Sequence, residues 1–586
     1  MLFRSLVFYD ISEIIAQDQS SISGRCQNYF YTIQFNTPIL SAEKNGKQTI
    51  VCFSQKNHLL CKTGFSTRGV AEATANLQAE IPDWQFDATR QNARRSWENL
   101  LGHVQVKGGS EQQKTIFYSA LYHSFLLPML VSDHHESEPR YNAFSPWDTY
   151  QTVHPLLTLL QPQQHGEMLA GLVNESARMG HFPGFAMAGN HIIAVLADAW
   201  AKGIRRFDLQ KAYALAQNTM LDSSQSMAAY NRAGYISADQ ANSVSITLAN
   251  AYDDWATSEL ARYAGKTADR PFFMKRALNY RNLFNPSTRL MSAKSTSGVW
   301  IDHIGFEEGD AWDYSWMAPH NMQDLINLMG GVEAFAEHLE SHFKSGRYLH
   351  DNEPSLHYAY LFNYAGMPWK TQKWVRNIMN CKYSATPGGL SGNDDLGSLS
   401  AWYVFSALGI YPVCPGRTQY IIAGPMFEKV TITLAKNKKL SIIAHRTNAN
   451  EIYIKKLCWN GKPYTKNWLE HSDLANGGIL EFFMTSQPDT TWGSAETALP
   501  PSLTKASSRF KIGNIKVMNT LVAGDTSAIT MEVSNSGERG SCETEILVDN
   551  ILYSSQWILL DKKESRTIAL PIRSEERRVG KECRSR

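Results

Sequence analysis

Hydrophobic and polar residues alternate along the first part of the chain. Between residues 29 and 65, runs such as YFYTIQF and QTIVCFS place an apolar side chain at every second position. This is the period of antiparallel strands with one buried face. The alternation stops near Val70, and good helix formers dominate the stretch that follows. The pattern predicts a partial β-sandwich over residues 1–83 and a linker helix within residues 84–112.

The pattern then becomes helical for about 300 residues. Segments such as HIIAVLADAWAKG and SLSAWYVFSALG are apolar on nearly every side, so we expect them to be buried between other helices. No run typical of a strand competes with them. Residues 113–415 therefore read as an all-α toroid whose inter-helix loops build a mouth at one end.

Strand-like alternation returns in the last third of the chain. KVTITL, LSIIAH and GILEFFM have period 2, and Asn460-Gly461 signals a type I′ hairpin turn. We expect a second β block over residues 416–498 and a small immunoglobulin-like β-sandwich over residues 508–572. The final fourteen residues, 573–586, read RSEERRVGKECRSR. One frame of a common sequencing-adapter oligonucleotide encodes this run, so we interpret it as an artefact.

Composition and charge exclude several classes of protein. The 586 residues are 43% hydrophobic and 19% charged, which allows a large core and excludes collagen, coiled coil and a disordered chain. The balance of 57 Lys and Arg against 55 Asp and Glu gives no global field for nucleic acid or an acidic membrane. The cysteines lack C-x-x-C spacing, so neither a zinc site nor a disulfide scaffold is indicated, although an isolated disulfide stays open. No apolar run is long enough to predict a membrane span.

The first segment that could carry chemistry is EEGDAWDYSW. Glu307, Glu308 and Asp310 lie beside Trp312 and Trp316. Crowded carboxyl groups against aromatic walls favour the protonated form of one of them, which a general acid requires. The alternative is a solvated acidic loop before a core helix.

The second segment is PGGLSGNDDLGSLSAW. Asn393, Asp394 and Asp395 stand where a buried helix opens, and the helix dipole and free backbone N–H groups there favour ionised carboxylates. An ionised carboxylate suits a general base or a metal ligand. Equally, Asp394 or Asp395 could simply cap the helix.

Two further segments offer weaker signals. Asn352 and Glu353, in DNEPSLH, provide oxygen ligands of the kind that Ca²⁺ prefers, without the spacing of an EF-hand. Trp147 and Asp148, in SPWDTYQTVH, pair an aromatic face with a carboxylate, a common way to hold a sugar ring. A Trp in a buried helix is, alternatively, part of the core.

Five motifs in order carry a family resemblance: SPWDTYQTVHPLLTLLQP, SVSITLANAYDDW, EEGDAWDYSWMAPHN, NEPSLHYAYLFNYAGMPWKTQ and GGLSGNDDLGSLSAWYVFSALGIYPVCPG. From about Thr67 to Gly493 the chain resembles glycoside hydrolase family 92, the calcium-dependent exo-acting α-mannosidases. The resemblance implies an (α/α)6 helical barrel packed on an antiparallel β-sandwich. It also implies single-step inverting hydrolysis of terminal α-mannosides, with Ca²⁺ holding the sugar ring in a distorted shape.

The resemblance also implies roles for individual residues. Glu308 matches the general acid, and Asp395, with Asp394 beside it, matches the loop that activates water. Asn352 and Glu353 match the calcium and mannose site. Trp147, Asp148 and Trp312 are the expected sugar contacts.

The chain also departs from the family pattern. Gln151 replaces an Arg, Leu356 replaces a His, and Asp310 and Asp313 stand where Asn and Gln are commoner, which leaves mannose orientation and linkage open.

The family normally has another half-sandwich before the point where this chain starts. We therefore expect an incomplete sandwich, with exposed apolar side chains such as those of Phe30, Ile33 and Val51.

The sequence leaves two other functions open. The chain would be a catalytically impaired mannose-binding or glycan-binding protein if loss of the expected N-terminal half-sandwich abolishes catalysis. A glycoside phosphorylase on a similar plan would need only one catalytic carboxylate and a phosphate pocket. The family resemblance favours α-mannoside glycans of the N-glycan or mannan type as partners, and a periplasmic or secreted location.

Overall fold

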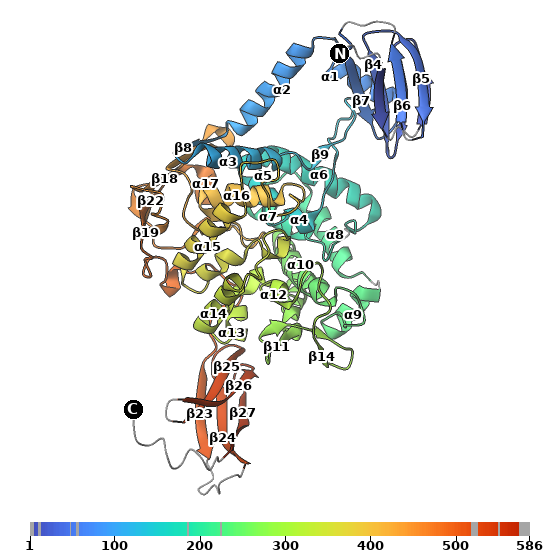
Figure 1. Cartoon of the computed structure of the whole chain (residues 1–586). Helices are drawn as coiled ribbons and strands as arrows, with labels where there is room; N and C mark the ends of the chain where they lie inside the picture. The colour runs from blue at the N-terminus through green and yellow to red at the C-terminus, as the bar shows by residue number, and fades with distance from the viewer. Residues whose placement is uncertain are drawn as a thin grey trace. The chain divides into compact units, whose positions relative to one another are not determined.

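The computed structural model describes two compact units (Figure 1). The described residues are 5–9, 13–46, 48–53, 58–184, 187–222, 225–516, 526–548 and 551–573. The first unit comprises residues up to 103 together with 126–144 and 167–172, and the second unit comprises the rest. The expected adapter-derived tail lies outside the described residues beyond Arg573, which ends the last strand.

The first unit is a sandwich of two antiparallel sheets, in strand order β2-β3-β4-β7 and β1-β6-β5. Tyr31 and Ile33 of one sheet face Val51 and Phe53 of the other in one buried cluster. The expectation that Ile33 and Val51 are exposed is therefore wrong, and Phe30 is half-buried. The physical reason is that each sheet covers the apolar face of the other. The elements of this unit are β1 Ser5–Tyr9, β2 Glu13–Gln17, β3 Ser21–Cys26, β4 Tyr29–Phe35, β5 Ile39–Asn45, β6 Gln48–Phe53, β7 Cys61–Ser66, α1 Val70–Glu80, α2 Phe86–Leu101, β9 Met129–Leu130 and β10 Tyr141–Asn142.

Helix α1 packs closely on strand β7 at Gly64. A Cβ atom at Gly64 would lie 2.2 Å from the Ala73 carbonyl oxygen and 2.6 Å from the Leu77 Cβ. Only glycine permits this approach of helix and strand. The contact is what allows α1 to cover the outer face of the sheet.

We therefore expect Gly64→Ala to destabilise the first unit by about 1–3 kcal/mol, because the added methyl group must push helix and strand apart. Hydrogen exchange of the backbone amides in α1 and β4 should accelerate accordingly. The matched control is Gly513→Ala, whose added Cβ would meet nothing within 4 Å. Unchanged exchange in Gly64→Ala would contradict the close approach.

The second unit is mainly helical. Nearly every residue of α5, α7, α10 and α16 is buried, as expected for the inner helices of a barrel, whereas α8, α14 and α15 each keep an exposed polar face. The predicted fold class, a multidomain α and β protein with an (α/α)6 barrel, is confirmed. The helices of this unit are α3 Glu111–His123, α4 Pro146–Thr149, α5 Val153–Leu160, α6 Pro162–Met179 (apart from residues 167–172), α7 Ile192–Ala201, α8 Leu209–Met220, α9 Gln225–Ala233, α10 Ser243–Tyr263, α11 Arg270–Arg276, α12 Ala311–Tyr314, α13 Met322–Leu328, α14 Val332–Lys344, α15 Pro368–Cys381, α16 Ser398–Leu408 and α17 His471–Asn476, with 3-10 helices η1 Asn279–Leu283, η2 Pro319–Asn321, η3 Glu353–Ser355, η4 Tyr358–Asn363, η5 Ala435–Asn437 and η6 Glu496–Ala498.

The β part of the second unit contains a six-stranded sheet in the order β20-β19-β22-β18-β17-β8. The turn between β19 and β20 has positive φ at both Asn460 (49°) and Gly461 (76°), which confirms the predicted type I′ hairpin. Strand β8 falls inside the segment predicted only as a linker helix. The strands are β8 Val104–Lys107, β11 Phe284–Asn285, β12 Leu290–Met291, β13 Ala293–Lys294, β14 Trp300–Ile301, β15 Ile410–Tyr411, β16 Gln419–Ile422, β17 Lys429–Thr433, β18 Lys439–His445, β19 Tyr453–Trp459, β20 Lys462–Pro463, β21 Trp468–Glu470 and β22 Gly478–Thr485.

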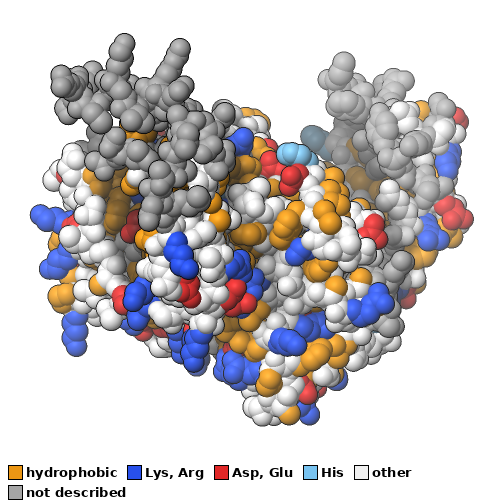
Figure 2. Space-filling view, turned by 90° about the horizontal axis from the view of Figure 1, so that it is seen from below, with side chains coloured by type: hydrophobic (Ala, Val, Ile, Leu, Met, Phe, Trp, Pro, Cys, Tyr) orange, Lys and Arg blue, Asp and Glu red, His pale blue; other side chains and the backbone are white. Residues whose placement is uncertain are grey.

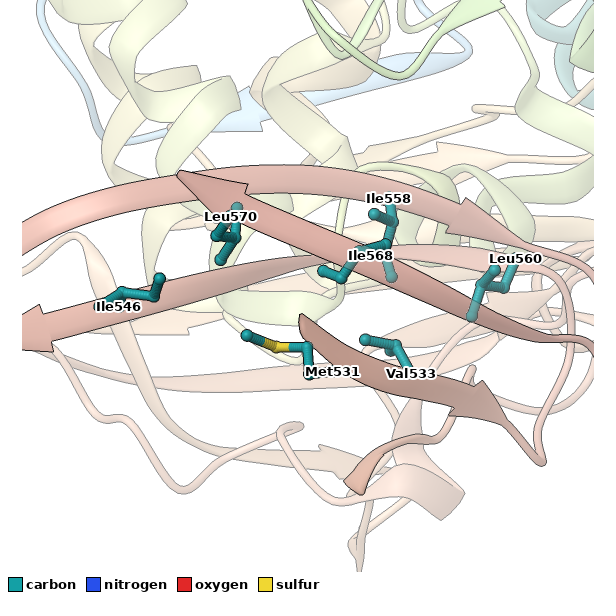
Figure 3. Close-up of a cluster of buried hydrophobic side chains, with 7 residues drawn as sticks. All are labelled: Met531, Val533, Ile546, Ile558, Leu560, Ile568 and Leu570. Atoms are coloured by element: carbon teal, nitrogen blue, oxygen red, sulfur yellow. The ribbon is translucent and has the colours of Figure 1, made fainter. Parts of the chain in front are cut away.

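The last five strands form a small module with its own core. Sheet β23-β24-β27 and the pair β25-β26 enclose a cluster of buried aliphatic and Met side chains (Figure 3). The members of the cluster are Met531, Val533, Ile546, Ile558, Leu560, Ile568 and Leu570. The strands are β23 Phe510–Lys516, β24 Thr526–Asn535, β25 Gly540–Val548, β26 Ile551–Leu560 and β27 Ser565–Arg573.

Charged side chains of both signs are interspersed on the described part of the face shown in Figure 2. This agrees with the near balance of 57 basic and 55 acidic residues. That face therefore shows no surface of a single sign that would attract a polyanion.

Candidate active site

Three carboxyl groups from distant parts of the second unit lie together. Oxygen atoms of Asp148, Glu353 and Asp395 all lie within 4.8 Å of one another. Asp148 belongs to α4, Glu353 opens η3, and Asp395 lies in the loop before α16. In the described part of the chain, no other group of three or more His, Cys, Asp or Glu residues lies so close. We call these three residues the carboxylate cluster.

The backbone before α16 determines which of two neighbouring aspartates joins the cluster. Asp395, Leu396 and Gly397 have φ angles of 41°, 60° and 90°, a left-handed run that is uncommon for residues other than glycine. The Asp394 carboxylate instead accepts hydrogen bonds from the Ser400 N–H (2.9 Å) and hydroxyl (2.8 Å). Asp394 thus hydrogen-bonds to the first turn of α16, whereas the Asp395 carboxyl group lies in the cluster.

Glu353 is the most buried member of the cluster. It is 2% exposed, and neither carboxyl oxygen has a hydrogen-bond partner. The nearby Ser398 hydroxyl donates instead to the Asp148 carbonyl oxygen at 2.8 Å. Burial, followed by the charges of Asp148 and Asp395, raises the pKa of Glu353 to about 9.

The other two carboxyl groups show the same tendency. Burial raises the pKa of Asp148 to about 6, and the charges of Asp395 and Glu308 add to that effect. Burial and the neighbouring Asp394 also raise the pKa of Asp395. Like charges this close cannot all be ionised unless a cation compensates them.

The donor atoms of the cluster fit a hard cation. All are carboxylate oxygens, without Cys or His, and both oxygens of Glu353 are buried without a hydrogen-bond partner. Ca²⁺ prefers such oxygens, whereas structural Zn²⁺ sites use Cys and His. The cluster is therefore a candidate metal site as well as a candidate catalytic site.

Glu308 lies beside this cluster on an exposed turn before α12. Its φ is 47°, its side chain is exposed, and its charge acts on Asp148. The Asn352 amide connects the two regions, because its Nδ2 donates to the Glu308 carbonyl oxygen (2.7 Å) while its Oδ1 accepts from the Glu353 N–H (3.0 Å). The structure thus brings Glu308, Asn352, Glu353 and Asp395 into one region of the second unit. Both ends of the Asn352 amide are used within the protein, so its role as a metal ligand stays a prediction.

The other acidic residues near Glu308 have structural roles. Asp310 caps α12 by accepting from the N–H groups of Trp312 (2.7 Å) and Asp313 (3.2 Å). Asp313 accepts from the Asp310 N–H at 2.9 Å, and burial, opposed by that bond, raises its pKa to about 6. These two residues match the alternative of an acidic loop before a helix.

The two Trp residues predicted to touch sugar are engaged elsewhere. Trp147 is 6% exposed and packs with Ala188 and Ala249, as the core alternative expects. The ring of Trp312 stacks on His338 with centroids 4.6 Å apart, and the Arg347 guanidinium lies 4.9 Å from its centroid. Their sugar contacts stay predictions.

Sequence reasoning missed a buried support beneath Glu353. The Gln151 Nε2 donates to the Glu353 carbonyl oxygen (3.2 Å), and its Oε1 pairs with the His357 Nδ1 (3.1 Å). The His357 Nε2 lies 3.2 Å from the Trp316 carbonyl oxygen. The only sequence signal was the position of Gln151 three residues after Asp148, where the family has Arg.

Most glycoside hydrolases use a pair of Asp or Glu carboxyl groups at one site, and the carboxylate cluster with Glu308 beside it offers such groups. Residues 72–486 match the model of the glycosyl hydrolase family 92 catalytic domain. The chain belongs to this family, and the predicted family is confirmed.

Several relatives support the assignment. The chain is 29% identical to a family 92 α-mannosidase of Bacteroides thetaiotaomicron, with a TM-score of 0.78 over 83% of this chain and 75% of that one. A family 92 inverting mannosidase of the same organism gives 29% identity and a TM-score of 0.79 over 85% and 79% of the two chains. An uncharacterized secreted glycosidase of the fungus Arthroderma benhamiae is 27% identical over 82% of this chain and 66% of its own length.

The chain thus spans about two thirds of the length of the curated fungal relative, 66%. None of the described helices combines the length and apolar character that crossing a membrane requires.

Proposed function

We propose that the chain is an exo-acting, Ca²⁺-dependent α-mannosidase that releases terminal α-linked mannose with inversion. The observation that carries the proposal is the carboxylate cluster, with Glu353 buried and unpartnered next to Asp395. Membership of family 92 supports it, as do two related structures described as α-mannosidases, one of them in complex with mannoimidazole.

Two carboxyl groups take the chemical roles. Glu308 acts as general acid and protonates the leaving oxygen, and its exposed position beside the cluster leaves it open to a substrate. Asp395 acts as general base on a water molecule on the opposite face of the sugar. For inversion we expect their carboxyl groups about 6.5–9.5 Å apart, which leaves room for that water.

Glu353 and Asp148 are the residues that would hold the ion, and their protein environment fits this role. Both are at least nine-tenths buried, and the Gln151 amide holds the Glu353 backbone in place. Bound Ca²⁺ would supply positive charge that keeps the carboxylates ionised and binds sugar hydroxyl groups. Asp394 positions the loop of Asp395 through Ser400 and takes no proton in this scheme.

The natural substrates under this proposal are mannose-terminated glycans of the N-glycan or mannan type. A periplasmic or secreted location fits the description of the fungal relative as a secreted glycosidase. The balanced charge of the chain gives no reason to expect nucleic acid as a partner.

The test is to incubate the chain with Ca²⁺ and α-1,2-, α-1,3- and α-1,6-linked mannobioses and to follow the anomeric protons by NMR. We expect free mannose on at least one linkage, with the β-anomer appearing first, because water attacks the face opposite the leaving group. First appearance of the α-anomer would contradict inversion. Failure to release mannose from every linkage would contradict the function itself.

A further inference from the structure

A cavity of the second unit lies next to the segment that carries Asp394 and Asp395. It has a volume of about 610 Å³ and is open to solvent. Helix α3 forms one wall, the segment from Tyr383 to Leu390 forms another, and Ser400 of α16 lies at its edge. We call it the α3 pocket. The carboxylate cluster does not line it.

The lining of the α3 pocket consists mainly of aromatic, hydroxyl and small apolar side chains. None of the described residues that line it is Asp, Glu, Lys or Arg. Aromatic rings of Tyr122, His123 and Tyr383 lie among the hydroxyl groups of Ser119 and Thr386. A ligand with both apolar faces and many hydroxyl groups, but no charge, suits such walls.

Other cavities of this unit have a different chemistry. One is lined by Lys202, Arg205 and Arg206, and another by Arg262 and Arg270 together with Glu259, which pairs with both. Those cavities carry charged side chains, whereas none of the described residues that line the α3 pocket is Asp, Glu, Lys or Arg.

The far wall of the α3 pocket is held in shape by its own hydrogen bonds. The Ser384 N–H donates to the Gly389 carbonyl oxygen (2.9 Å), and the hydroxyl groups of Ser384 and Thr386 are 2.9 Å apart. A Cβ atom at Gly389 would lie 2.1 Å from the Ser384 carbonyl oxygen, so this turn requires glycine. The Tyr383 hydroxyl donates to the Leu399 carbonyl oxygen at 2.8 Å. A preformed wall loses little entropy when a ligand binds.

Two residues that line the α3 pocket contact Asp394, which precedes Asp395 of the candidate active site. Ser400 lines the pocket, and its hydroxyl donates to Asp394 at 2.8 Å. His123 lines it too, and its Nδ1 lies 3.6 Å from the Asp394 carboxylate. Asp395, the next residue, belongs to the carboxylate cluster. The lining of the pocket is therefore in direct contact with the segment that carries Asp395.

We propose that the α3 pocket binds a further neutral sugar unit of the same glycan whose terminal mannose occupies the carboxylate cluster. This inference rests on the proposed function. Binding there adds affinity for longer glycans that short substrates cannot use, so it acts through KM on long substrates.

The first experiment compares kcat/KM on a mannose-terminated oligosaccharide with kcat/KM on an aryl α-mannoside. We expect Tyr122→Ala to lower the ratio of the two about three- to tenfold, because it removes an aromatic wall that is 37% exposed. Tyr122→Phe keeps the ring and should keep most of the ratio. Ser119→Phe, which fills the pocket, should lower the ratio as well. The matched control is Phe272→Ala, an exposed aromatic residue on α11.

An equal ratio in Tyr122→Ala, Phe272→Ala and the unaltered chain would overturn the proposal. A second measurement does not need catalysis: hydrogen exchange of residues 115–123 and 383–390 with methyl α-mannoside or with a mannose pentasaccharide. We expect extra protection only with the pentasaccharide, and less of it in Tyr122→Ala. Absence of extra protection overturns the pocket whatever the activity. Extra protection without hydrolysis of any α-mannoside would contradict the proposed function and leave the pocket supported.

Discussion

Glu308→Gln should lower kcat on alkyl α-mannosides by about 10²- to 10⁴-fold, because the amide cannot donate the proton that an alkoxide leaving group requires. The loss should be much smaller on aryl mannosides that carry an activated phenol, which leaves without protonation. The substitution is nearly isosteric, and the Asn352 amide holds the backbone of residue 308 rather than its side chain. The turn should therefore keep its shape. Steady-state kinetics on the two substrates checks the prediction.

Glu307→Gln is the matched control for this measurement. It makes the same chemical change one residue earlier, where the carboxylate pairs with the Asn242 amide. We expect kcat of this variant to stay close to that of the unaltered chain on both substrates. If Glu308→Gln lowers kcat by the same factor on alkyl and aryl mannosides, the carboxyl group binds substrate and does not protonate the leaving oxygen.

The elements that the sequence predicts well are those with a long local period. Buried helices such as α10 and α16 and alternating strands such as β18 are visible because their own residues carry the pattern. Strand β8 is not, since VQVK has only four residues and its partner β17 is far along the chain. The grouping of residues 126–144 with the first unit likewise depends on contacts that no local pattern encodes.

The candidate site shows the same division between local and distant information. Residue type singled out Asp148, Glu353 and Asp395, but only the fold shows that they form one cluster. The neighbouring Asp394 and Asp395 could not be told apart, because the left-handed backbone that separates them is a tertiary property. His357, buried beneath the site, carried no signal of its own, since a lone His in an apolar segment is usually a core residue.

Glu353→Gln should separate metal binding from folding. Without a divalent ion, we expect the variant to be at least as stable as the unaltered chain, since it removes one of three crowded buried carboxyl groups. With Ca²⁺, the unaltered chain should gain thermal stability, because an ion that binds only the folded state stabilises it, and the variant should gain little. Mutating a residue that only supports a metal ligand typically lowers activity about 10- to 100-fold. We expect Glu353→Gln to lower the rate of mannose release by at least this factor.

The measurement is thermal denaturation of both chains in excess chelator and again with added Ca²⁺, alongside mannose release. Chelator should abolish the activity of the unaltered chain, and Ca²⁺ should restore it where Zn²⁺ fails, because the cluster offers only oxygen ligands. Glu340→Gln, a carboxylate on α14 that pairs with Lys370, serves as control and should keep the full response to Ca²⁺. If Glu353→Gln gains as much stability from Ca²⁺ as the unaltered chain, the ion binds elsewhere. The buried, unpartnered carboxyl group of Glu353 would then be neutralised by a single proton rather than by a metal ion.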